Sequence, residues 1–81
     1  MAIKEIKILS TAYFGKYQII QFDDMYKTIR VLVNGQVVAD NNHAAVRSIA
    51  EALSINVLNS SGNPKDTYTL GAEVIYKINS I

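Results

Sequence analysis

Side chains that commonly carry chemistry are scarce in this sequence, and none fall at catalytic spacings. The chain has no cysteine and a single histidine, His43, so neither a thiolate nucleophile nor a common zinc site of Cys and His ligands can be assembled. Asp23 and Asp24 adjoin, but neighbours along a strand point to opposite faces and in a turn both are solvated. Ser10-Thr11 has no base nearby, and Ser60-Ser61-Gly62-Asn63 lacks a phosphate-binding pattern. We therefore expect no enzymatic activity, no metal and no cofactor.

A binding surface is better supported, because aromatic and cationic residues share one segment. Five of the seven aromatic residues fall within fourteen positions: Tyr13, Phe14, Tyr17, Phe22 and Tyr26. Lys16, Lys27 and Arg30 lie among or just after them. Tyrosines on a sheet suit protein interfaces, whereas aromatics with cations can also stack on single-stranded nucleic acid. In a third interpretation the phenylalanines are core residues and the tyrosines half-buried.

Length and composition indicate one small globular domain over residues 1–81. The chain is 49% hydrophobic and 19% charged, which is enough apolar material for a core of its own. The net charge of +1 does not by itself indicate a nucleic-acid partner. No apolar run approaches the ~20 residues that span a bilayer, and the first residues lack a signal-peptide apolar region. We expect a cytoplasmic protein that does not enter a membrane.

The first half of the chain has the composition of β-strands. Strands are predicted over residues 3–9, 17–22, 26–33 and 36–39, with breaks at Ser10-Thr11-Ala12 and Asp23-Asp24. Asn34-Gly35 predicts a tight type I′ hairpin turn, because both residues tolerate positive φ. The four segments together predict an antiparallel meander.

The second half predicts two helices. Asp40-Asn41-Asn42 can cap a helix over residues 44–53, whose Val46, Ile49, Ala50 and Leu53 form one apolar stripe. After a loop of Asn, Ser, Gly and Pro, Asp66 or Thr67 caps a second helix with Leu70, Val74, Ile78 and Ile81 on one side. Gly71 weakens that helix by about 1 kcal/mol relative to Ala, so we expect a packing reason for it.

The predicted fold is α+β: a small antiparallel meander of about four strands followed by two helices packed on one face, in the order ββββαα. The other face of such a sheet is commonly solvated and is the natural place for function. Ile19 and Ile20 point to opposite sides of one strand, so the pattern leaves open which face is covered. Within residues 26–33, alternation puts Ile29, Val31 and Val33 on the core side.

The same alternation puts Tyr26, Thr28, Arg30 and Leu32 on the opposite side, with the composition of a recognition patch. The residues that we expect to bind a partner are Tyr17, Tyr26, Lys27, Thr28 and Arg30.

Several short stretches resemble a known family. They are Lys7-Ile8-Leu9-Ser10-Thr11-Ala12-Tyr13, Phe22-Asp23, Lys27, Arg30-Val31, Val33-Asn34-Gly35 and Leu70-Gly71. In these the chain resembles the small phage-encoded anti-CRISPR proteins that inhibit type I-F systems, specifically the first-described family of such inhibitors. The resemblance covers about the first half of the chain and a few helix positions, and it implies the same ββββαα fold.

The resemblance implies a non-enzymatic viral protein that binds backbone subunits of a host CRISPR surveillance complex and blocks its access to target DNA. The family uses tyrosine and acidic residues on a sheet surface. In this sequence Ile8 and Phe22 stand where the family has tyrosines, and no acidic residue stands at Val31 or Leu32. Tyr17, Tyr26 and Arg30 are nearby residues that could take over those contacts.

Two other partners stay open from the residues alone. A small nucleic-acid-binding accessory protein is the alternative function, and its affinity would fall steeply with salt. A homo-oligomer that pairs exposed edge strands is the third, because only Lys4, Glu5 and Lys7 guard the edge of the first strand.

Overall fold

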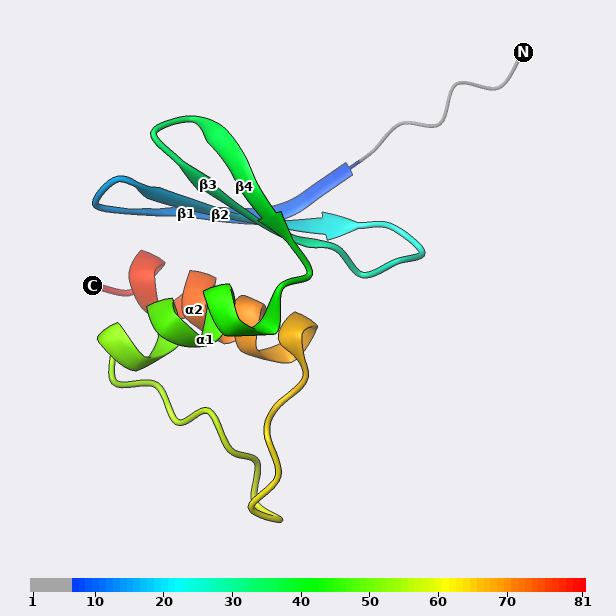
Figure 1. The fold of residues 1–81 in the computed structure, drawn as a ribbon, viewed down its shortest axis with the longest axis vertical. Helices are drawn as coiled ribbons and strands as arrows, with labels where there is room; N and C mark the ends of the chain where they lie inside the picture. The colour runs from blue at the N-terminus through cyan, green and yellow to red at the C-terminus, as the bar shows by residue number, and fades with distance from the viewer. Residues whose placement is uncertain (1–6) are drawn as a thin grey trace.

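The computed structural model describes residues 7–81 as one four-stranded antiparallel sheet followed by two helices (Figure 1). The strands are β1 (Lys7–Phe14), β2 (Tyr17–Asp23), β3 (Ile29–Val33) and β4 (Gln36–Asp40), and they lie in the sheet in chain order. The helices are α1 (His43–Ala52) and α2 (Thr67–Asn79). The predicted ββββαα order and α+β class are confirmed. Among the described residues, neither helix is long and apolar enough to cross a membrane.

Tight turns join the strands, and glycine supplies positive φ at two of them. Asn34 and Gly35 have φ of 51° and 83°, which confirms the predicted hairpin between β3 and β4. Gly15, with φ of 60°, begins the turn that joins β1 to β2. The predicted break at Ser10-Thr11-Ala12 is wrong, because these residues pair with β2 and the chain turns at Gly15-Lys16 instead. Residues 3–6 of the predicted first strand lie outside the described residues.

The predicted third strand begins too early. Lys27 has a left-handed φ of 51°, which interrupts an extended strand, and β3 starts at Ile29. Asp24 holds the intervening turn: its carboxylate accepts hydrogen bonds from the Thr28 amide at 2.9 Å and the Thr28 hydroxyl at 2.6 Å. Placing Asp24 at a turn is therefore correct, although its side chain holds the turn rather than being merely solvated. Placing Asp23 there is wrong, because Asp23 is the last residue of β2 and pairs with Lys7.

Side-chain caps begin both helices as the sequence indicates. Asn42 precedes α1, and its side chain accepts a hydrogen bond from the Ala45 amide at 3.1 Å. Asp66 precedes α2 and accepts from the amide of Thr69 at 3.1 Å and from its hydroxyl at 2.7 Å. Each cap satisfies amides that have no partner within the helix, so these short helices start at defined residues.

Both helices lie on one side of the sheet, and the core fills the space between them (Figure 1). Helix α2 packs against β1, β2 and β3, and α1 packs against α2. The residues buried there from the strands include Ala12, Ile19, Ile29 and Val31, and those from the helices include Val46, Ile49, Leu70 and Val74. The helices therefore cover the face that carries Ile19, and the face that carries Ile20 is open.

Gly71 has the packing role that its helix cost suggests. A Cβ at this position would lie 2.7 Å from Cδ1 of Ile29 and 2.9 Å from both Cγ1 and Cγ2. Ile29 is fully buried, so Gly71 lets α2 lie close against β3.

Candidate functional site

The strongest candidate for a binding surface is the sheet face opposite the helices. The strand registers place on this side the residues that alternate with the core residues. Six of them are apolar, and we call them the open-face patch: Ile8, Tyr13, Ile20, Phe22, Leu32 and Val37. They come from all four strands, so the sheet itself holds them in one layer.

The rim of the open-face patch is exposed to an unusual degree for apolar residues. Ile8 is 57% exposed and Tyr13 67%, both on β1, and Val37 on β4 is 52% exposed. Ile20 and Phe22 at the centre are only 8% exposed, although no helix of residues 7–81 covers them. A solvated sheet face normally alternates apolar with polar residues, whereas β2 presents apolar residues to both faces. Several exposed apolar side chains on one face of a sheet are typical of interaction sites.

One ion pair lies across the patch. The guanidinium of Arg30 donates from Nε to Oδ1 of Asp40 at 2.8 Å and from Nη2 to Oδ2 at 3.0 Å. These hydrogen bonds lower the pKa of Asp40 and raise that of Arg30, while partial burial works in the opposite direction on each. The guanidinium also lies 5.1 Å from the ring centre of Phe22. Arg30 therefore shields Phe22 and is neutralised by Asp40.

Polar side chains complete this face beside the aliphatic ones. The Thr11 hydroxyl donates to the carbonyl oxygen of Ile19 at 3.0 Å. The side-chain nitrogen of Gln18 donates to the Thr11 hydroxyl oxygen at 3.3 Å. Both polar residues thus have partners within the sheet. A partner that covers this face leaves the Thr11 hydroxyl and the Gln18 side-chain nitrogen with these hydrogen bonds.

The five residues expected to bind a partner do not share one surface. Arg30 lies on the open face, but Tyr17 is half-buried on the helix side, where it packs against the core. Tyr26, Lys27 and Thr28 lie in the turn between β2 and β3, not in a strand. Arg30 and Leu32 lie on the face that alternation predicts, but Tyr26 and Thr28 do not follow the alternation because Lys27 breaks the extended backbone.

The turn between β2 and β3 presents two exposed side chains on a braced support. Met25 is 77% and Tyr26 76% exposed, directly after the carboxylate of Asp24 that holds the turn. The ammonium of Lys27 lies 5.7 Å from the ring centre of Tyr68 in α2, which ties the turn to the helix layer. The turn is therefore a second apolar contact point beyond the end of the sheet.

The apolar rim residues Ile8 and Val37 were absent from the expected binding set. The signal that could have found them is in β2, where Ile20 and Phe22 stand beside Gln18 at positions that a solvated face would fill with polar residues. Such a strand needs cover on both sides, and its cross-strand neighbours Ile8 and Leu32 then belong to the second side.

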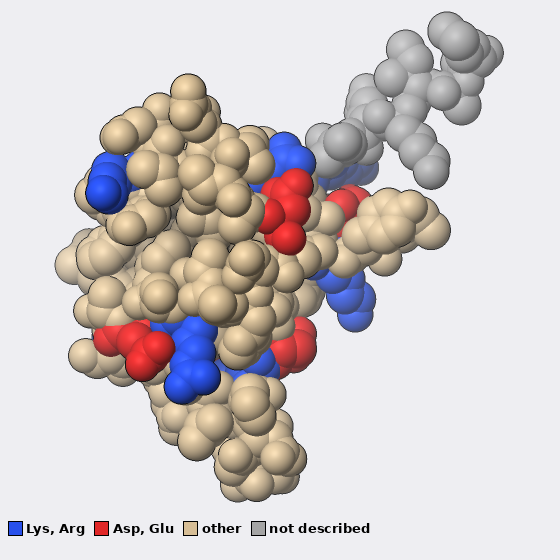
Figure 2. Space-filling model, viewed as in Figure 1, with Lys and Arg blue, Asp and Glu red and all other residues tan. Residues whose placement is uncertain are grey.

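Neither the single histidine nor the charged residues form a second candidate site. His43 is half-buried, and its Nε2 lies 3.1 Å from the Lys65 carbonyl oxygen, so the imidazole ties α1 to the segment before α2. Within residues 7–81 no three His, Asp or Glu side chains gather as metal ligands would. In the view of Figure 2, cations and anions are interspersed rather than gathered by sign.

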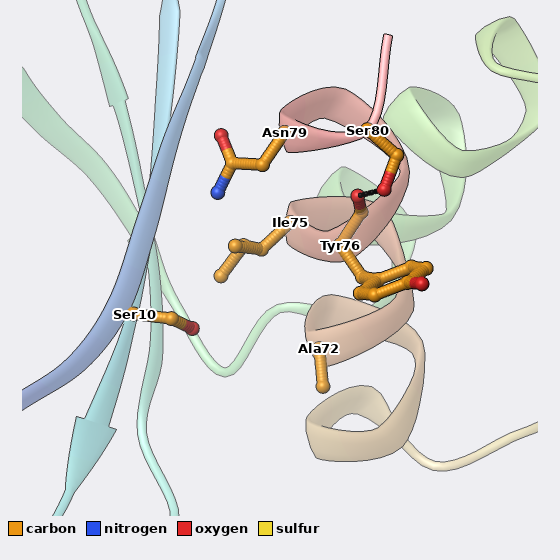
Figure 3. A pocket seen from close by; sticks show the side chains of 6 residues that line it. All are labelled: Ser10, Ala72, Ile75, Tyr76, Asn79 and Ser80. Carbon is orange, nitrogen blue, oxygen red and sulfur yellow. Dashed lines mark hydrogen bonds between the residues drawn. The ribbon is translucent and has the colours of Figure 1, made fainter.

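A shallow hollow of about 380 Å³ lies on the helix side, between β1 and α2 (Figure 3). Its lining is mostly small or apolar: Ser10, Ala72, Ile75, Tyr76, Asn79 and Ser80. The Ser80 hydroxyl donates to the Tyr76 carbonyl oxygen at 2.7 Å, and Ser10 donates to Gln21 at 2.9 Å. Both hydroxyls are therefore engaged within the protein, and the hollow holds no ionisable lining residue other than the phenol of Tyr76.

Comparisons of the chain with protein-family models, with curated proteins and with solved structures found no match. The geometry of the chain's own residues therefore carries the functional argument.

Proposed function

We propose that this protein is a non-enzymatic binding protein that docks its open sheet face on a partner protein. The observation that carries the proposal is the open-face patch, an apolar layer that includes exposed Ile8, Tyr13 and Val37. Its single ion pair leaves the patch without net charge. Protein interfaces have this composition, with an apolar and aromatic centre that includes an arginine.

The free energy gained by burying the open-face patch does not by itself exceed the cost of association, so a second contact is needed. Full burial of a Val, Leu, Ile or Phe side chain stabilises by about 1.5–3 kcal/mol, so three half-exposed rim residues contribute roughly 2–5 kcal/mol. Association costs an estimated 4–15 kcal/mol. Met25 and Tyr26, on their braced turn, are two further large exposed apolar side chains that can add to the contact.

The resemblance to type I-F anti-CRISPR proteins supports a finer proposal for the partner. In that family a sheet surface binds the backbone subunits of a CRISPR surveillance complex and blocks target DNA. We propose that the equivalent contact of this chain lies on the open face around Arg30, with Tyr26 adding a contact from the adjoining turn. An apolar patch in place of the family's tyrosines calls for a correspondingly apolar site on the partner subunit.

A nucleic-acid partner is less well supported than a protein partner. On the open face, Arg30 is the cation in a strand position that could contact a backbone phosphate, and Phe22 and Tyr13 are the aromatic rings that could stack on a base. Asp40 already occupies the guanidinium, and the guanidinium in turn covers the Phe22 ring. Stacking on nucleic acid needs free aromatic faces along a cationic track.

A gel-shift series tests the function. Labelled target DNA is mixed with a type I-F surveillance complex, with this protein, and with both. The proposal predicts that the complex-bound band is lost only when both are present. A band shifted by the protein alone, weakening with salt, would instead support the nucleic-acid alternative.

Two variants locate the activity on the surface. Leu32→Asp places a charge in the open-face patch without touching the core, and Leu58→Asp places the same charge on an exposed apolar residue of the loop before α2. We expect Leu32→Asp to abolish inhibition and Leu58→Asp to retain it, with circular dichroism confirming that both fold. Full inhibition by Leu32→Asp would show that the open face is not the inhibitory surface.

A further inference from the structure

We infer that the free protein covers its open face with a second copy of itself, as a face-to-face dimer. The inference does not require the partner proposed above. Leu32 on β3 and Val37 on β4 lie opposite each other on the open side, and Val37 is 52% exposed. In two-sheet proteins such faces pack against each other about 10 Å apart. Here the second sheet has to come from another molecule.

Charge complementarity favours a second copy as the occupant. Arg30 and Asp40 are the ionised residues in the strand positions of the open face, and they sit directly opposite each other on β3 and β4. A two-fold axis parallel to these strands and midway between them exchanges the two strands between the copies. Each Arg30 then faces Asp40 of the other copy, and each Leu32 faces Val37 of the other copy. The face is therefore complementary to itself, as a two-fold interface requires.

Both sheet edges are less suitable for self-association than the face. On β1 the Thr11 carbonyl accepts a hydrogen bond from the Asn79 side chain at 3.1 Å, so α2 already occupies part of that edge. On β4 the register shifts between Val37 and Ala39, and a bulge of this kind interrupts the ladder that an added strand would need. Pairing of edge strands between copies is thereby disfavoured.

Self-association on the open face has a consequence for partner binding. If both use the same patch, the dimer must separate before the patch meets the partner, and apparent affinity falls by the fraction of protein that is monomeric. The apparent affinity for the partner and the fraction of dimer would then both depend on protein concentration.

Sedimentation equilibrium of the protein alone tests the dimer. We expect a concentration-dependent monomer–dimer equilibrium, and Leu32→Asp should raise the dimer dissociation constant at least about tenfold because it places a carboxylate against the facing apolar side chain. Leu58→Asp, away from the face, should leave the constant unchanged. A protein that stays monomeric to about 1 mM, or a dimer indifferent to Leu32→Asp, would overturn the inference.

A charge-exchange experiment tests the orientation. Arg30→Asp gives a face with two carboxylates and Asp40→Arg a face with two guanidinium groups, so each variant repels a copy of itself. Mixed in equal amounts, the two should form a heterodimer, although each alone is monomeric. A mixture that remains monomeric, while circular dichroism shows both variants folded, would refute the two-fold arrangement. If both variants dimerise alone as strongly as the unaltered protein, the ion pair does not lie in the interface and the arrangement is equally refuted.

Discussion

Replacing Gly71 by Ala should destabilise the protein, although alanine is the better helix former. The added Cβ would lie within 3.0 Å of three atoms of Ile29, closer than carbon atoms pack. Ile29 is fully buried in β3, and its two γ-carbons branch from Cβ, so no rotation of the side chain removes every clash.

The magnitude follows from two opposing effects. Helix propensity favours alanine over glycine by about 1 kcal/mol. Overpacking of a tight core costs about 1–3 kcal/mol, and three simultaneous clashes with one immobile side chain place this site in the upper half of that range. The free energy of unfolding should therefore fall by about 1–2 kcal/mol, against a total of roughly 4–12 kcal/mol for a chain of 81 residues.

Urea denaturation followed by circular dichroism measures the change. Ser48→Ala, at an exposed position of α1, is the control in which a helix former is added without a clash. Ile29→Val removes the atom nearest to the new methyl group, so Gly71→Ala should cost less in that background than in the unaltered protein. If Gly71→Ala instead stabilises the unaltered protein by about 1 kcal/mol, helix propensity outweighs the clash with Ile29.

Three further changes test the local supports of the fold. Hydrogen bonds from the hydroxyl and amide of Thr69 lower the pKa of Asp66 from its ordinary 3.8. The ionised carboxylate therefore adds to the free energy of unfolding above pH 3.8, and this contribution is lost as pH falls through the lower pKa of the folded state. Asp66→Asn, which still caps the helix, should make the urea midpoint depend less on pH in acid. Gly35→Ala should lower the free energy of unfolding by about 1–2 kcal/mol, because φ is 83° there, and an unchanged thermal midpoint would contradict this. Asn41→Ala should cost about 1–3 kcal/mol in chemical denaturation, since its side chain accepts from the buried Ile29 amide at 2.7 Å.

Most of the fold was predictable because its signals are local. The Asn34-Gly35 turn, the caps at Asn42 and Asp66, and the apolar stripe of α1 each depend on a few neighbouring residues. The break at Ser10-Thr11-Ala12 was wrong because pairing decides that segment: Ala12 lies opposite Ile19 and is buried under α2, whatever its own preference. The start of β3 at Ile29 could not be predicted either, since no sequence signal indicates a left-handed φ at Lys27.

The candidate site was only partly predictable. Alternation placed Arg30 on the side opposite Val31 correctly, but it could not say which side the helices cover. Helix α2 packs against the side of the sheet that carries Ile29, where Gly71 lets it approach β3 closely. Tyr17 and Arg30 therefore lie on opposite faces, and Ile8 and Val37 join Arg30 through cross-strand pairing that a linear pattern does not contain.

Methyl NMR of the labelled protein, on addition of unlabelled type I-F surveillance complex, measures whether the open sheet face binds the partner. We predict that the methyl signals of Ile8, Leu32 and Val37 broaden or shift, while those of Leu58 on the helix side stay in place. Perturbation confined to Leu58 and the helices, or no perturbation at all, would contradict the account.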